Sequence, residues 1–165
     1  MTATPENAGT GTAATPLQDA EFATVPALQA ALSAEHAAVY AYGYIGARSD
    51  GAQRERCYAH LDAHRGQRDT LRIELRDRGA TPDPGKAAYD LPGGDSGADL
   101  AAYARSVEQQ TAQSYLELAA APGTAVRELA LRSLRDATLR AVEWGAELPA
   151  FPGFPDEGPP PQAGG

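Results

Sequence analysis

Apolar residues recur at helical spacing in four stretches of the chain, and residues typical of turns separate these stretches. The predicted helices cover about residues 24–48, 54–78, 98–121 and 124–149. Pro26 suits the first turn of a helix, and Gly79 suits the position just after the end of the second helix. No stretch alternates between apolar and polar residues as a half-buried strand would. We therefore expect an all-α protein.

The connections between the predicted helices differ in length. Two are tight turns, whereas the connection over residues 81–97 is long and rich in proline and glycine, with Asp95 or Ser96 as the expected cap of the third helix. This arrangement predicts an antiparallel four-helix bundle with a long crossover between helices 2 and 3. Residues 1–23 and 152–165 carry few large apolar side chains, so we expect disordered tails on either side of a folded unit of residues 24–151.

Polar residues interrupt the apolar seams of the first three helices. A seam followed at steps of three and four residues places Glu35 in the middle of the first helix, with His36 beside the seam. In the second helix, His64 and Arg68 take interior positions between leucines. The third helix admits two phases, and only one of them places Glu108 inside. The first two helices are therefore predicted to bring polar groups together at mid-height.

The seam of the fourth helix contains no carboxylate and no histidine, because Asp136 and Glu143 fall on its flanks. Its predicted members are Ala130, Leu134, Ala137, Ala141, Trp144 and Leu148. A buried metal centre in a bundle takes ligands from several helices, so this apolar seam argues against a complete two-metal centre.

Composition and charge exclude several classes of protein. A formal net charge of −8 argues against a nucleic-acid binder, which needs a basic face. The single cysteine, Cys57, excludes an internal disulfide and a multi-cysteine zinc site, and its place on the seam indicates a small core residue. No apolar run approaches the roughly 20 residues of a membrane span, and the first residues do not read as a secretory signal. We expect a cytoplasmic protein that binds neither nucleic acid nor membrane.

Four segments resemble an actinobacterial family of ferritin-like proteins, the domain of unknown function DUF4439. They are AEHAAVYAYG (34–43), AHRGQRDTL (63–71), YDLP (89–92) and AVEWGAELPAFPG (141–153). The resemblance implies a ferritin-like bundle over nearly the whole folded unit and no assigned activity. Ferritin-like di-metal proteins place a glutamate on each of two helices and a Glu-x-x-His motif on each of the other two. Here Glu35 and Glu108 match the single glutamates, whereas the second helix has no Glu-x-x-His motif. Its nearest candidates are Asp62-Ala-His64 and the His60/His64 pair, and the fourth helix has no histidine.

One interpretation of these residues is a buried polar network without a cofactor. A lone buried Glu35 would be costly, so His64 or Arg68 is expected to pair with it, and Tyr42 and Tyr115 are expected to reach carboxylates or water. The protein is then a ferritin-like bundle of structural or interaction function. This is the interpretation that the apolar fourth helix favours.

The alternative interpretation is a metal-binding oxidoreductase with a mononuclear or degenerate di-metal site. Glu35, His64, Glu108 and His60 would then hold iron or manganese. His60 is otherwise expected to be a partly exposed hydrogen-bonding group. No catalytic residue can be assigned, so the pattern leaves open whether the protein is an enzyme. A homodimer through an outer helix face is a further expectation, with no protein partner indicated.

Overall fold

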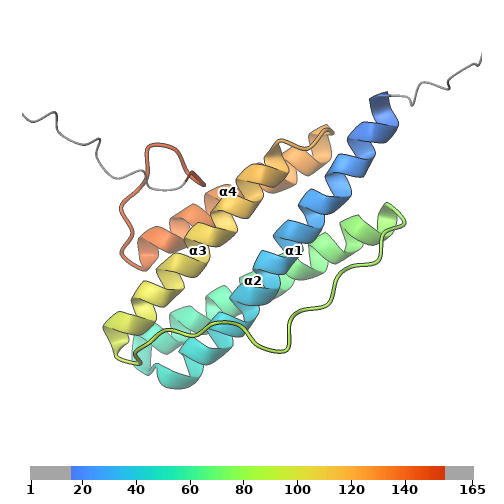
Figure 1. The fold of residues 1–165 in the computed structure, drawn as a ribbon. Helices are drawn as coiled ribbons and strands as arrows, with labels where there is room; N and C mark the ends of the chain where they lie inside the picture. Colours follow the sequence, from blue (N-terminus) through green and yellow to red (C-terminus); the bar gives the residue numbers. More distant parts are fainter. Residues whose placement is uncertain (1–15, 155–165) are drawn as a thin grey trace, which may run out of the picture.

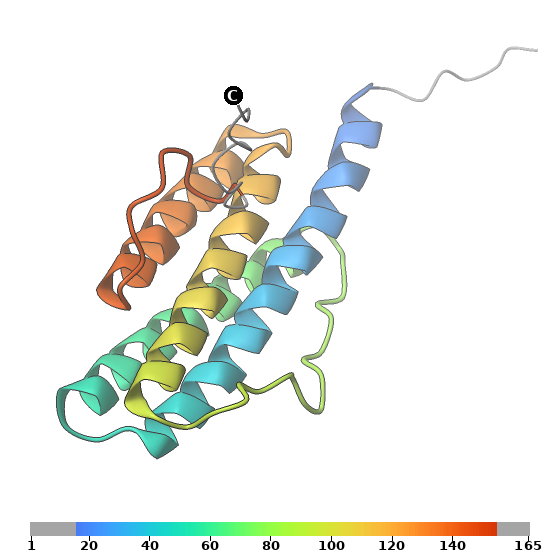
Figure 2. The same ribbon diagram turned by 60° about the vertical axis from the view of Figure 1, so that its left-hand side comes forward.

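The computed structural model describes residues 16–154, and this part of the chain contains four helices and no strand. The helices are α1 (Pro16–Arg48), α2 (Gly51–Asp77), α3 (Gly97–Ala119) and α4 (Thr124–Glu143). α1 and α2 form one antiparallel hairpin and α3 and α4 form another, while the long crossover runs past α1 to the start of α3 (Figure 1). The hairpins pack together through α1 and α3 (Figure 2). The predicted all-α four-helix bundle with a long crossover is confirmed.

The helix ends follow local sequence signals in two places. Ser96 accepts a hydrogen bond from the backbone N–H of Asp99, and the Asp99 carboxylate accepts one from the backbone N–H of Ser96, which completes a capping box at the start of α3. Gly79 has a φ of 71°, and the N–H of Ala80 reaches back to the carbonyl of Leu75. A left-handed residue of this kind ends a helix, as predicted for Gly79.

Two helix boundaries differ from the prediction by six residues or more, and α2 begins at Gly51, three residues earlier than predicted. α1 begins at Pro16, so Pro26 lies inside the helix and the predicted tail 1–23 overlaps it. α4 ends at Glu143, followed by Gly145 with a φ of 88°, because this conformation takes the chain out of the helix. Leu148 consequently lies exposed beyond the helix and is not a seam residue. The rest of the predicted tails, residues 1–15 and 155–165, lies outside the described residues.

The apolar core consists of two clusters at opposite ends of the bundle. The Leu32 cluster is built from Leu28, Ala31, Leu32, Leu71, Leu75, Ala112, Tyr115, Leu118, Ala121, Val126, Ala130, Leu134 and Ala137. The Ile45 cluster is built from Ala38, Ala41, Tyr42, Ile45, Cys57, Leu61, Leu100, Ala104, Val107 and Trp144. The polar side chains described below lie between them. Cys57 is fully buried in the second cluster, as its seam position predicted.

After α4 the chain turns back along the α3–α4 hairpin as a strap of residues 145–154 (Figures 1 and 2). Gly153 lies so close to α3 that a Cβ atom there would be 2.8 Å from the Leu116 Cβ and 3.0 Å from the Ala112 carbonyl oxygen. Its φ of 86° also favours glycine. Glycine at this position therefore lets the strap lie against the bundle.

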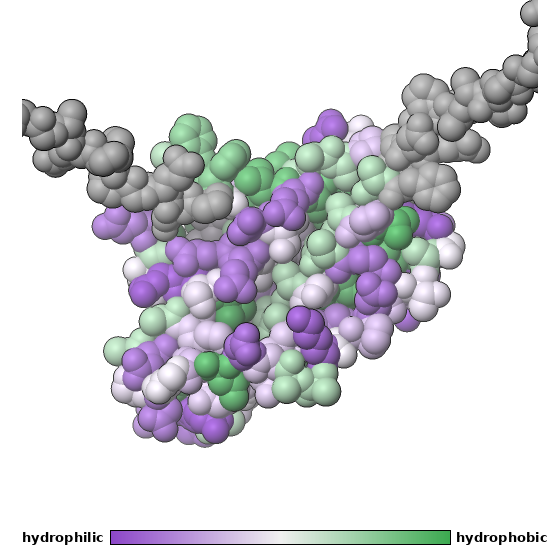
Figure 3. Space-filling model, viewed as in Figure 1, coloured by the Kyte–Doolittle hydropathy of each residue, from purple (hydrophilic) through white to green (hydrophobic). Residues whose placement is uncertain are grey.

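No helix in the described part of the chain is long and apolar enough to cross a membrane. Hydrophilic and hydrophobic side chains are interspersed over the face shown in Figure 3.

Candidate functional site

A layer of polar side chains crosses the bundle between the two apolar clusters, and all four helices contribute to it. This polar layer consists of Glu35, Tyr42, His60, His64, Glu108, Tyr115, Arg140, Glu143 and Trp144. The side chains of Glu35, His64 and Glu108 are fully shielded from solvent. Buried charges of this kind are stable only when each is paired and hydrogen-bonded, so the contacts of each group decide what the layer can do.

His64 lies at the centre of the polar layer. Its Nδ1 is 2.7 Å from Oε2 of Glu35, and its Nε2 is 2.9 Å from Oε1 of Glu108. Only a doubly protonated imidazole donates hydrogen bonds from both nitrogens. Burial by itself would lower the pKa of His64, but the hydrogen bonds and charges of Glu108 and Glu35 outweigh it and raise this pKa to about 9. His64 is therefore a buried cation at neutral pH.

Glu108 accepts hydrogen bonds from three other helices. The Tyr42 hydroxyl donates to its Oε1 over 2.6 Å, and Nε of Arg140 lies 3.0 Å from each of its two oxygens. Burial alone would raise the pKa of Glu108, yet His64 and Arg140 hold it below its usual range. Burial likewise opposes the charge of Arg140, and Glu108 raises the pKa of that guanidinium. Glu108 is thus a carboxylate between two cations.

Glu35 forms the inner end of the polar layer. One of its oxygens faces His64, and the other accepts a hydrogen bond from the Tyr115 hydroxyl over 2.6 Å. Burial and the charge of Glu35 raise the pKa of Tyr115 well above its usual value, so the hydroxyl stays protonated and donates a hydrogen bond to Glu35. The two carboxylates are matched by the His64 imidazolium and the Arg140 guanidinium. The buried part of the layer is therefore electrically neutral.

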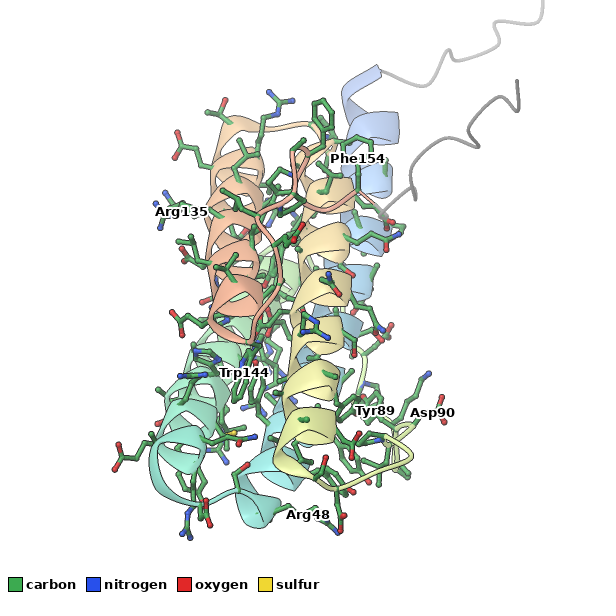
Figure 4. All side chains as sticks on the ribbon, turned by 90° about the vertical axis from the view of Figure 1, so that its left-hand side faces the viewer. Arg48, Tyr89, Asp90, Arg135, Trp144 and Phe154 are labelled. Carbon is green, nitrogen blue, oxygen red and sulfur yellow. The ribbon has the colours of Figure 1, made fainter. Side chains whose placement is uncertain are left out.

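The outer end of the layer reaches solvent between α2 and α4. The indole N–H of Trp144 donates to the Tyr42 hydroxyl oxygen over 2.8 Å and to Nδ1 of His60 over 3.0 Å. Nε2 of His60 lies 3.0 Å from Oε2 of Glu143, whose side chain is 55% exposed. Burial lowers the pKa of His60, so the ring is neutral at neutral pH and donates to Glu143. Figure 4 shows Trp144 at the end of α4, beside α2.

Most of the residues predicted for the site come together in the structure. Glu35, His64, Glu108, Tyr42 and Tyr115 are all in hydrogen-bonded contact through the layer. The phase of the third helix that buries Glu108 is the observed one.

The predicted pairing of Arg68 with Glu35 is wrong. Nη2 of Arg68 lies 3.0 Å from Oδ1 of Asp69 at the surface. Burial lowers the pKa of His36, which faces the crossover, and the charges of Arg72 and Arg68 lower it further. Both oxygens of Glu35 are already occupied by His64 and Tyr115. The guanidinium in the polar layer comes from Arg140, and it pairs with Glu108.

The expectation that His60 is partly exposed is also wrong, because its residue is only 7% exposed. His60 lies four residues before His64, which places both side chains on one face of α2. The Tyr42, Trp144 and Glu143 side chains then enclose its ring.

Three members of the layer were not predicted: Arg140, Glu143 and the indole N–H of Trp144. A signal for Arg140 exists in the sequence, since it lies three residues after Ala137 and four before Trp144 and so shares their face of α4. The small side chains of Ala137 and Ala141 leave room for a guanidinium to reach inward. Within residues 16–154, no group of three or more histidine, cysteine, aspartate or glutamate side chains is placed to hold a metal ion.

A family model described as a domain of unknown function (DUF4439) matches residues 27–156. Among solved structures, the conserved hypothetical protein rv2844 from Mycobacterium tuberculosis is 31% identical to this chain with a TM-score of 0.72, and the match covers 74% of this chain and 95% of that one. A ferritin-like, diiron-carboxylate protein from Bacillus anthracis str. Ames is 19% identical with a TM-score of 0.64, and the match covers 76% of this chain and 94% of that one. The second likeness shows a ferritin-like fold alone. No curated protein matches this chain.

Proposed function

The chain belongs to the DUF4439 family and has a ferritin-like fold, and we propose that it is a metal-independent member of this fold in which the polar layer stands in place of a two-metal centre. The observation that carries the proposal is the position of His64, which bridges Glu35 and Glu108 through both ring nitrogens. A histidine that donates two hydrogen bonds in this way has no lone pair left for a metal ion.

Charge balance supports the proposal. Two divalent ions carry four positive charges, and ferritin-like di-metal sites offset them with four glutamates and two neutral histidines. The buried part of this layer has two carboxylates, Glu35 and Glu108, and Arg140 already lies against one of them. Two ions would leave a large uncompensated positive charge in the core. The residues present therefore do not fit a two-metal centre.

In this proposal the layer serves the architecture of a structural or interaction protein. Its hydrogen bonds join each helix to at least one other across the bundle, and they close only when the helices are in one register. Buried polar groups can specify a unique arrangement of helices even where they add little net stability. A cytoplasmic location and a homodimer remain predictions, and light scattering on the purified chain tests the second.

Metal analysis tests the proposal directly. We expect freshly purified protein from cells supplied with iron and manganese to carry far less than one ion per chain. We also expect Fe²⁺, Mn²⁺ and Zn²⁺ to leave the melting temperature unchanged, because a ligand raises it only by binding the folded state.

The competing function is the metal-dependent oxidoreductase, with Glu35, His64, Glu108 and His60 as ligands. It requires stoichiometric iron or manganese that disappears in Glu35→Ala and persists in Asp62→Ala, a matched carboxylate that pairs with Arg65 at the surface. That result would overturn the metal-independent proposal.

A further inference from the structure

A continuous hydrogen-bonded path connects solvent with the buried His64. The path runs from Glu143 through His60, Tyr42 and Glu108 to His64. Its four links measure 3.0 Å from Glu143 to His60, 3.2 Å from His60 to Tyr42, 2.6 Å from Tyr42 to Glu108 and 2.9 Å from Glu108 to His64. All four are within hydrogen-bonding distance. The path therefore has no gap between the exposed carboxylate and the core.

Each group along the path can both accept and release a proton. Tyr42 is the branch point, because its hydroxyl has two acceptors, Oε1 of Glu108 at 2.6 Å and Nδ1 of His60 at 3.2 Å. Rotation of this one hydroxyl connects the inner and outer halves of the path. The indole N–H of Trp144 contacts both Tyr42 and His60. Because an indole only donates, Trp144 fixes the geometry and carries no proton.

The outer end of the path opens into a surface pocket. The pocket has a volume of about 200 Å³ and is lined by Gln53, Arg56, Ala101, Glu143 and Trp144. A pocket of this size admits several water molecules. Water can therefore take a proton from Glu143 or deliver one to it.

We propose that this path is a proton relay, which exchanges the buried proton of His64 with solvent while the bundle stays folded. His64 releases its Nε2 proton to Oε1 of Glu108. Tyr42 passes its own proton to Nδ1 of His60 as it accepts this proton from Glu108. His60 then releases its Nε2 proton to Glu143, and Glu143 releases it to water. One proton leaves the core, no electron moves, and the reverse sequence returns the proton.

On the opposite side of His64, a similar row of hydrogen-bonded side chains does not end at an ionisable surface group, so it serves as a control. There Glu35 accepts from Tyr115, and the Ser133 hydroxyl contacts Tyr115 in turn. Beyond Ser133 the next group is the side-chain amide of Gln67, which donates over 2.7 Å. An amide does not take up and release protons at neutral pH. Tyr42 and Tyr115 thus make equal hydroxyl contacts with buried carboxylates, and only Tyr42 lies between His64 and an ionisable surface group.

Proton exchange at the His64 ring tests the relay. The full chain is labelled with ¹⁵N-histidine, and the exchange of the His64 Nε2 proton with water is followed by NMR in the unmodified protein, Tyr42→Phe and Tyr115→Phe. We expect Tyr42→Phe to slow this exchange by about a hundredfold, the usual effect of losing one positioned proton carrier. Tyr115→Phe should not slow it.

If the His64 proton instead exchanged only when the protein unfolds transiently, the tyrosine variants would exchange faster and not more slowly. Each tyrosine variant loses one hydroxyl donor to a buried carboxylate, so both would open more readily and exchange faster. Acceleration in both variants would overturn the relay. His60→Phe provides a second test at the rim of the bundle, since it keeps an aromatic ring beside Trp144 and removes both nitrogens. We expect it to slow exchange as much as Tyr42→Phe, and an unchanged rate would also overturn the relay.

The relay rests on His64 carrying a proton in place of a metal ion, as the proposed function states. The NMR experiment distinguishes failure of the relay from failure of the proposed function. If a metal occupies His64, one ring N–H signal is missing in every variant. If only the relay is wrong, both ring signals are present and Tyr42→Phe does not slow the exchange of the Nε2 proton.

Discussion

The Leu32 cluster and the polar layer hold the same four helices together by different physics. The cluster joins apolar side chains through contacts that have no preferred direction, and its contribution follows the area removed from water. The layer joins a few atoms at 2.6–3.2 Å, and each bond depends on direction and on protonation. The apolar clusters therefore drive the helices together, whereas the layer selects one register and provides the groups with chemistry.

The largest expected effect comes from removing the carboxylate shared by both cations of the layer. Glu108→Ala leaves the His64 imidazolium and the Arg140 guanidinium buried without their partner, which costs about 4 kcal/mol of unfolding free energy. Urea denaturation at neutral pH measures this loss.

Leu71→Ala is the matched substitution in the Leu32 cluster, because Leu71 is also fully buried. Its expected cost is about 3 kcal/mol, set by lost contacts and the remaining cavity. The cost of Leu71→Ala should be the same in neutral and alkaline solution, whereas that of Glu108→Ala should shrink as His64 loses its charge. Equal pH behaviour of the two variants would contradict the distinction between cluster and layer.

The second prediction concerns the pH dependence of the unmodified protein. The folded pKa of His64, about 9, lies above its ordinary value of 6.5. The resulting stability is fully present below the unfolded pKa and is lost as the pH rises through the folded pKa, a loss of about 3 kcal/mol. Chemical denaturation, followed by circular dichroism at pH values from 6.5 to about 9, measures the slope of the unfolding free energy against pH.

His64→Gln is the control for this slope, because glutamine cannot take the charge. Burial also raises the pKa of Cys57, so some alkaline loss should remain in the variant. A slope as steep in His64→Gln as in the unmodified chain would show that another group is responsible.

The smallest expected effect lies outside both regions, in the strap. Gly153→Ala places a methyl group 2.8 Å from the Leu116 Cβ at a φ of 86°. We expect a local cost of about 2 kcal/mol, because an L residue is strained in this conformation. Limited proteolysis should show faster cleavage of the strap, while the melting temperature of the helices changes little. A large drop in that temperature would place the strap among the elements that hold the bundle.

The fold was predictable because its signals repeat along whole helices. The seam through Leu28 and Leu32 identifies the buried face of α1 from several residues at once, and a wrong assignment at one position does not change it. The start of α1 depends on fewer signals. A proline is well suited to a first turn and costly in a helix interior, which favoured a start near Pro26, yet α1 continues through this residue. The proline alone therefore could not decide where the helix begins.

The composition of the polar layer was only partly predictable, because helical phase gives the direction of a Cβ and not the path of a long side chain. Arg68 and Arg140 illustrate this limit. Arg68 sits on a predicted seam but pairs with the adjacent Asp69. Arg140 was not a predicted seam residue, yet it shares the face of Ala137 and Trp144, and its guanidinium reaches inward past small neighbours on α4 to the carboxylate of Glu108. Which arginine reaches the core depends on tertiary contacts that no single helix encodes.

The position of Trp144 gives the molecule an internal optical probe. It is the only tryptophan in the chain, its residue is 4% exposed, and its indole lies between Tyr42 and His60. The fluorescence of the whole protein under tryptophan-selective excitation therefore originates at the mouth of the polar layer. Protonation of His60, rotation of the Tyr42 hydroxyl or entry of water there will change this emission without any introduced label.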